Sequence, residues 1–261
     1  MQARIVTCHL APRIFAVARI DSAPRQRVSW CGAHEGVHML LKIEGLLSTA
    51  DVARIREMLS GATFADGRLT AGEAVRDVKN NLQATGQEKL LDEARQLITV
   101  ALLKNEAFTS RALPRRLLPP MFNRYDSGME YGGHVDNAIM GAADPLRVDI
   151  SITVFLSDPK DYDGGALLIN SDGEPHKVKL AAGGAVIYDS TSIHKVEPVT
   201  RGSRLAAVIW AQSFVRDGAR REILQELAEA ARWARTVSPG SQEAMKISKV
   251  RANLMRMWAE L

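Results

Sequence analysis

The chain has 261 residues, of which 46% are hydrophobic and 25% charged, which is ordinary for a folded soluble protein and sufficient for a sizeable core. No apolar run approaches the roughly 20 residues that a membrane helix needs, so no membrane partner is expected. The net charge is +4. Residues 1–37 hold five arginines against two acidic residues, so the rest of the chain is nearly neutral. Bulk charge therefore gives no argument for a nucleic-acid partner.

Residues 1–37 read as an N-terminal extension. They contain both cysteines, Cys8 and Cys31, and lack the apolar core and small-residue cleavage site of a secretory signal. They show no sustained periodicity. We expect a poorly ordered segment, or a start codon set too far upstream with Met39 near the true beginning. Without a disulfide framework, the cysteine usage fits a reducing, cytoplasmic location.

A helical support region is predicted for residues 38–113. Ser48, with Asp51 three positions later, resembles a capping box and starts a helix. Apolar residues recur at helical spacing after it and again over 87–104. Between the two helices, 61–84 is richer in Gly, Asp and Asn and reads as a loop with a strand.

A β core is predicted for residues 114–213. In 147–156 apolar and polar residues alternate, which is typical of a half-buried strand. No helical pattern interrupts the short strands that follow one another, which favours a barrel or jelly roll over a parallel sheet with crossover helices. The further predicted strands are 121–126, 165–170, 176–180, 184–189, 194–198 and 203–212.

A C-terminal helical region is predicted for residues 214–261. Helical periodicity returns after Asp217, and a second apolar stripe follows Ser238-Pro239-Gly240. The stripes are most simply surfaces that pack on the β core or on each other. A groove for a partner is the alternative, and the same helices could serve a homo-oligomer.

His134 and Asp136 form a His-x-Asp pair. On an extended segment such residues point to the same face and can converge on one ion. Alone, the pair is equally explained as solvated polar residues. His194, at the start of another predicted strand, completes a set of two histidines and one carboxylate, which binds one face of a metal and leaves positions open. The alternative for His194 is a strand-edge histidine with a local hydrogen bond.

Arg204 lies ten residues beyond His194, on an apolar strand. A guanidinium there is costly to bury unless an anion pairs with it, and its planar fork suits a carboxylate. A metal with vacant positions beside such an arginine suits 2-oxoglutarate, whose keto-acid end chelates iron. The alternative is that Arg204 pairs with a protein carboxylate such as Asp149.

Four segments carry a resemblance to a known family: FNRY at 122–125, YGGHVDNA at 131–138, FLSDPKDYDGGAL at 155–167 and HKVEPVTRGSRLA at 194–206. The shorter segments KNN at 79–81 and QSFVRD at 212–217 also fit it. They resemble the bacterial PKHD-type hydroxylases among the Fe(II)/2-oxoglutarate-dependent dioxygenases. The resemblance covers about Met39 to Leu261. It implies a mainly β fold with flanking α-helices, in which a double-stranded β-helix (jelly roll) carries N-terminal and C-terminal helices.

The resemblance implies that His134, Asp136 and His194 bind Fe(2+) and that Arg204 binds 2-oxoglutarate. It further implies O2 as co-substrate, release of succinate and CO2, L-ascorbate as reductant and a link to iron uptake. The family pattern usually has proline where this chain has Asp189, which adds a carboxylate near the site. The primary substrate is not readable from the sequence.

Three more residues could contact the co-substrate: Tyr125, Tyr131 and Asn123. The tyrosines are equally explained as core residues with satisfied hydroxyls. One rival interpretation is a cupin-like metal-binding barrel, although those usually use a His-x-His pair. A second is a non-enzymatic small-molecule binding module, and a third is a nucleic-acid demethylase of the same fold, for which the last strands lack a further arginine.

Overall fold

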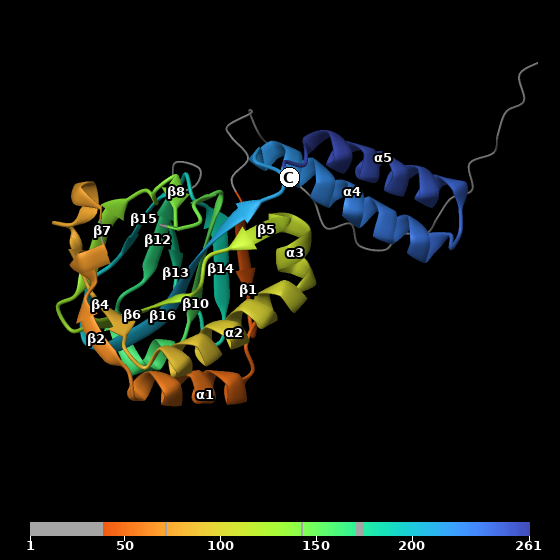
Figure 1. The fold of residues 1–261 in the computed structure, drawn as a ribbon. Coiled ribbons are helices and arrows are strands. Elements are labelled where there is room, and N and C mark those ends of the chain that lie inside the picture. The colour runs from red at the N-terminus through yellow and green to blue at the C-terminus, as the bar shows by residue number, and fades with distance from the viewer. Residues whose placement is uncertain (1–38, 71, 142, 171–174) are drawn as a thin grey trace, which may run out of the picture. The chain divides into compact units, whose positions relative to one another are not determined.

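The computed structural model describes residues 39–70, 72–141, 143–170 and 175–261 (Figure 1). All of them belong to one compact unit. The predicted extension, residues 1–37, lies outside the described residues.

The larger of two main sheets is antiparallel and has nine strands (Figure 1). Its central strand is the 15-residue β16, which pairs with β10 on one side and β6 on the other. The path runs β1 (Leu40–Ile43), β14 (Ala185–Asp189), β10 (Ile150–Phe155), β16 (Val199–Ser213), β6 (Met121–Asp126), β4 (Leu82–Thr85) and β2 (Thr63–Asp66), and β5 (Pro114–Leu117) and β11 (Tyr162–Gly164) pair with β16.

The smaller sheet is antiparallel and has five strands, and one buried cluster joins residues of both sheets, including Phe155 of β10 and Ile169 of β12. Two packed antiparallel sheets confirm the predicted mainly β architecture. The order is β13 (Pro175–Val178), β12 (Leu167–Asn170), β15 (Ile193–Val196), β7 (Glu130–His134) and β3 (Lys79–Asn80); β8 (Ile139–Met140) and β9 (Leu146–Arg147) form a separate ribbon.

In the described part of the chain, the α-helices before β5 are α1 (Thr49–Ser60), α2 (Glu88–Lys104) and α3 (Glu106–Ala112). The predicted cap is present, since the Ser48 side chain accepts a hydrogen bond from the backbone N–H of Asp51. Helices α1 and α2 lie against the large sheet, where Ile55 and Leu91 join Ile152 in one apolar cluster (Figure 1). The short α3 and the strands β2, β3 and β4 were not separately predicted.

Strand β10 is buried on both faces, so the expectation of a half-buried strand was wrong. Ile150, Ile152 and Val154 face the cluster that includes the helices. The alternate residues Ser151 and Thr153 are buried as well, because they face the space between the sheets. Polar residues on a covered face need partners, and this face is where the candidate site lies.

Two C-terminal helices follow the core: α4 (Gly218–Val237), capped by Asp217, and α5 (Gln242–Trp258). They pack against each other, and Leu224 of α4 is buried beside Val215. The predicted C-terminal apolar stripe is only partly covered, since Val250 of α5 is 48% exposed and Leu261, beyond the end of α5, is 93% exposed. No helix of the described residues has the length and apolar character needed to cross a membrane.

Candidate active site

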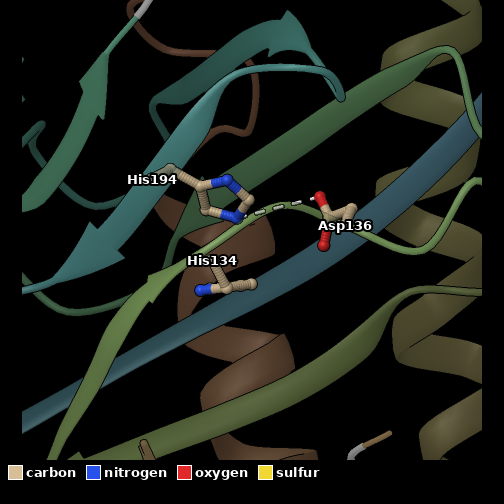
Figure 2. A group of neighbouring side chains, drawn as sticks. All are labelled: His134, Asp136 and His194. Carbon is tan, nitrogen blue, oxygen red and sulfur yellow. Dashed lines mark ion pairs between the residues drawn. The ribbon is translucent and has the colours of Figure 1, made fainter. Parts of the chain in front are cut away.

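His134, Asp136 and His194 come together between two neighbouring strands of the small sheet (Figure 2). His134 ends β7 and lies directly opposite His194 on β15. Asp136 follows two positions after His134, as the spacing predicted. One potential ligand atom from each residue lies within 4.8 Å of the others, and His194 Nε2 is 3.7 Å from Asp136 Oδ2.

Backbone carbonyl groups orient both histidine rings. Nδ1 of His134 lies 2.8 Å from the Gly132 carbonyl oxygen, and Nδ1 of His194 lies 3.1 Å from that of Ser192. A carbonyl oxygen can only accept, so each Nδ1 donates and each Nε2 keeps a lone pair for a metal. Burial, with a smaller contribution from His194, lowers the pKa of His134 to about 4, so this ring is neutral near pH 7.

Asp136 is held by a chain of hydroxyl groups from the large sheet. Its side chain is 7% exposed. Ser151 Oγ of β10 donates to Asp136 Oδ2 over 2.6 Å, and Ser190 Oγ lies 2.7 Å from Ser151 Oγ. Such partners fix the direction of a ligating carboxylate. The buried polar face of β10 therefore supports the site.

Asp189, which replaces the proline usual in the family pattern, pairs with groups outside the site. Its Oδ1 accepts a 2.5 Å hydrogen bond from Arg221 of α4, and its Oδ2 accepts from the Met39 backbone N–H. Arg221 is 4% exposed, so this is a buried ion pair. The Asp189 carboxylate therefore joins α4 to the end of β14 through Arg221 and is not a fourth potential metal ligand.

A cavity of about 400 Å³ opens at the three residues. All seven predicted site residues line it: His134, Asp136, His194, Arg204, Tyr125, Tyr131 and Asn123. Sequence reasoning missed further lining residues, notably Lys79, Tyr188 and Trp210. Tyr188 meets His194 edge-on, with 5.1 Å between ring centroids. Its place at the end of an apolar strand gave no signal of this contact.

Arg204 is a buried cation in the same cavity, 2% exposed and without an ion pair among the described residues. Its guanidinium lies over the rings of Tyr125 and Phe155, at 5.2 and 5.4 Å from their centroids, and its Nε has no hydrogen-bond partner in the described part of the chain. Asp149, the alternative partner, binds Arg147. A buried guanidinium without a counter-charge suits an anionic ligand.

Asn123 and the two tyrosines occupy different settings in the wall. Asn123 Oδ1 accepts from Asn81 and Gln83, and its Nδ2 donates to the Met121 carbonyl, so its amide is engaged within the protein. Tyr131 stacks on His134 with 3.7 Å between centroids. Tyr125 is 3% exposed and lies opposite Arg204. Contacts of these three residues with a co-substrate stay predictions.

The donor set fits a divalent iron ion. Two neutral imidazole nitrogens and one carboxylate on one side of a cavity leave the other coordination positions open to ligands from that cavity. The unpaired Arg204 in the same cavity fits the far carboxylate of a chelating 2-oxo acid.

Comparisons with known proteins show the family of the chain. A model of the 2OG-Fe(II) oxygenase superfamily matches residues 120–212. A PKHD-type hydroxylase of Xanthomonas campestris is 45% identical over 228 residues, covering 85% of this chain and all of the relative. One of Bordetella pertussis is 42% identical over 226 residues, with the same coverage. The solved structure of SnoN, a non-heme alpha-ketoglutarate-dependent epimerase, aligns with a TM-score of 0.50 and 14% identity, covering 67% of this chain and 78% of SnoN.

The jelly-roll fold and the His-Asp-His site define a 2OG-Fe(II) oxygenase, so the protein is an Fe(II)- and 2-oxoglutarate-dependent dioxygenase. The identity to the two PKHD-type hydroxylases, 45% and 42%, extends over the whole length of each relative. The chain belongs to the PKHD-type hydroxylases. This result sets aside the cupin-like barrel and the non-enzymatic binding module.

Proposed function

We propose that the protein hydroxylates a small organic substrate or side chain, with iron held by His134, Asp136 and His194 and 2-oxoglutarate anchored by Arg204. The observation that carries the proposal is the unpaired, buried Arg204 in the cavity of the triad. When bound, the iron and 2-oxoglutarate supply the oxidising chemistry, with O2 consumed and succinate and CO2 released.

The residues of the chain supply position and a dry environment. The histidines present Nε2 lone pairs because their Nδ1 atoms are committed to carbonyl groups. Ser151 keeps Asp136 turned toward the histidines. Tyr188 and Tyr125, both nearly fully buried, line the cavity and would limit the access of water to the reacting groups.

Three finer features belong to the same proposal. The family resemblance supports L-ascorbate as the reductant that restores Fe(II) and a link of the activity to iron uptake. The lack of a disulfide framework supports a cytoplasmic location. The partly exposed apolar face of α5 supports a homo-oligomer.

Turnover of 2-oxoglutarate tests the proposal without knowledge of the primary substrate. The purified protein with Fe(II), ascorbate and O2 should form succinate slowly from 2-oxoglutarate alone. His134→Ala should form none. Succinate formation that is equal in the two proteins would contradict the assignment of the metal site.

A further inference from the structure

Lys79 is a second buried cation in the wall of the cavity. It is 7% exposed and lies on β3, opposite Tyr131 of β7. Its Nζ is 5.3 Å from the centre of the Tyr131 ring, and that ring stacks on His134. One aromatic ring therefore separates the Lys79 ammonium from the proposed iron ligands.

The Lys79 ammonium lacks a counter-ion among the described residues. Its Nζ donates to Thr70 Oγ1 over 3.3 Å, the one hydrogen-bond partner that the described part of the chain gives it. Asp66, the carboxylate within electrostatic reach outside the site, binds Arg68 at 2.6 Å. An ammonium has three hydrogens, so donors remain for a ligand in the cavity.

Lys79 is largely charged at neutral pH in spite of its burial. Burial lowers its pKa to about 8, and the carboxylates of Asp136 and Asp66 oppose that change. A cation that is buried without a partner is costly and gains most from an anionic ligand.

The charges that line the cavity indicate what this ligand must carry. Asp136, Arg204 and Lys79 are the acidic and basic side chains of the lining besides the two histidines, which would hold the metal through neutral nitrogens. Iron contributes two positive charges and 2-oxoglutarate two negative ones, so iron, co-substrate, Asp136 and Arg204 balance without Lys79. The charge of Lys79 is then left for the primary substrate to neutralise.

The rest of the lining mixes polar side chains, among them Thr70, Gln83 and Asn137, with apolar ones. Trp210 Nε1 is buried and has no hydrogen-bond partner among the described residues. A ligand that reaches Trp210 would therefore meet one N–H without a partner among the described residues. Apolar residues of the lining include Leu118, Met121, Ile139, Met140 and Val208.

We propose that the primary substrate is an organic acid or acidic residue whose carboxylate binds Lys79, while its apolar body packs beside Trp210. This inference rests on the proposed function, because it assumes that 2-oxoglutarate occupies Arg204. Lys79 is accordingly a substrate-binding residue that sets specificity for a negative charge.

Calorimetric titration with matched probes tests the inference. The protein is loaded anaerobically with Fe(II) and 2-oxoglutarate, and then titrated with N-acetyl-L-leucine or N-acetyl-L-leucinamide. A second pair, acetyl-Leu-Glu-Leu-amide and its glutamine counterpart, replaces the terminal carboxylate by a side-chain carboxylate. The pair that shows a preference for the acid identifies which of the two sources of carboxylate the cavity accepts.

In at least one pair we expect the acid to bind about tenfold more tightly than the amide, because the amide leaves the buried cation unpaired. Lys79→Met should reduce the ratio to about twofold or less, whereas Lys79→Arg should keep most of it. The preference should also fade as the pH rises through about 8, where Lys79 loses its charge. Lys104→Met, at an exposed lysine in the last turn of α2, is the matched control and should change nothing.

Equal binding of acid and amide in both pairs, no binding of any probe at millimolar concentration, or an unchanged ratio in Lys79→Met would overturn the inference. So would a Lys79→Met variant that loses 2-oxoglutarate affinity instead, since Lys79 would then hold the co-substrate. Failure of the unmodified protein to bind 2-oxoglutarate at the loading step would instead refute the proposed function.

Discussion

Replacing Arg204 by methionine should separate binding of the co-substrate from stability of the fold. The guanidinium is 2% exposed and lies over two aromatic rings, so any carboxylate that it binds is removed from water. Loss of one partner of a buried, hydrogen-bonded charge pair costs about 2–5 kcal/mol. At about 1.4 kcal/mol per factor of ten, a value near 3 kcal/mol raises the Kd of 2-oxoglutarate about 100-fold.

The stability of the apoprotein should not fall in the Arg204→Met variant. Arg204 has no ion pair among the described residues, so methionine removes a desolvated charge without leaving another charge unpaired. We expect the Tm of the apoprotein to be unchanged or higher. Arg204→Lys is the control, because it keeps the charge but loses the planar fork and should give an intermediate Kd.

The assay is anaerobic titration of 2-oxoglutarate into the Fe(II)-loaded protein, together with thermal unfolding of the apoprotein and a measured affinity for Fe(II). A Kd for 2-oxoglutarate that methionine leaves within about twofold of the original would refute the anchor. A large fall in the Tm of the apoprotein would show that Arg204 has a structural partner instead.

Three further predictions concern the supports of the site. Ser151→Ala should weaken Fe(II) binding by about 10–100-fold in a competition titration, because Asp136 loses the hydroxyl group that orients it. Arg221→Met should lower the free energy of unfolding by about 3–5 kcal/mol in urea, because it leaves Asp189 buried without its partner. The free energy of unfolding of the apoprotein should fall as the pH decreases from about 6.5 toward 4, because His134 takes up a proton at higher pH in the unfolded chain than in the folded one. His134→Gln should flatten this dependence. An unaltered slope would contradict the lowered pKa of His134 in the folded protein.

The sequence predicted the β core and the helices around it because their patterns are local. Short strands were predicted at the positions of β6 and β14, the cap at Ser48 located the start of α1, and the helical periodicity that returns after Asp217 located α4. Burial on both faces of β10 could not be read in the same way. It depends on a second sheet that covers Ser151 and Thr153, and an alternating pattern does not report such a layer.

The candidate site was predictable to the extent that its residues form a recognisable set. His134, Asp136, His194 and Arg204 were selected by spacing and chemistry together with the family resemblance, and the structure brings them to one cavity. Lys79 was not selected as a site residue, although KNN at 79–81 fits the family resemblance. The sequence does not reveal that β3 pairs with β7 and buries the Lys79 ammonium beside Tyr131.

The most direct measurement of the central claim is the visible absorption of the protein under anaerobic conditions with Fe(II) and 2-oxoglutarate. Chelation of iron by the 2-oxo acid should produce a weak charge-transfer band that requires His134 and both additions. The band should saturate at one equivalent of Fe(II) per chain. Absence of the band at saturating Fe(II) and 2-oxoglutarate would contradict the assignment of His134, Asp136 and His194 as the iron ligands.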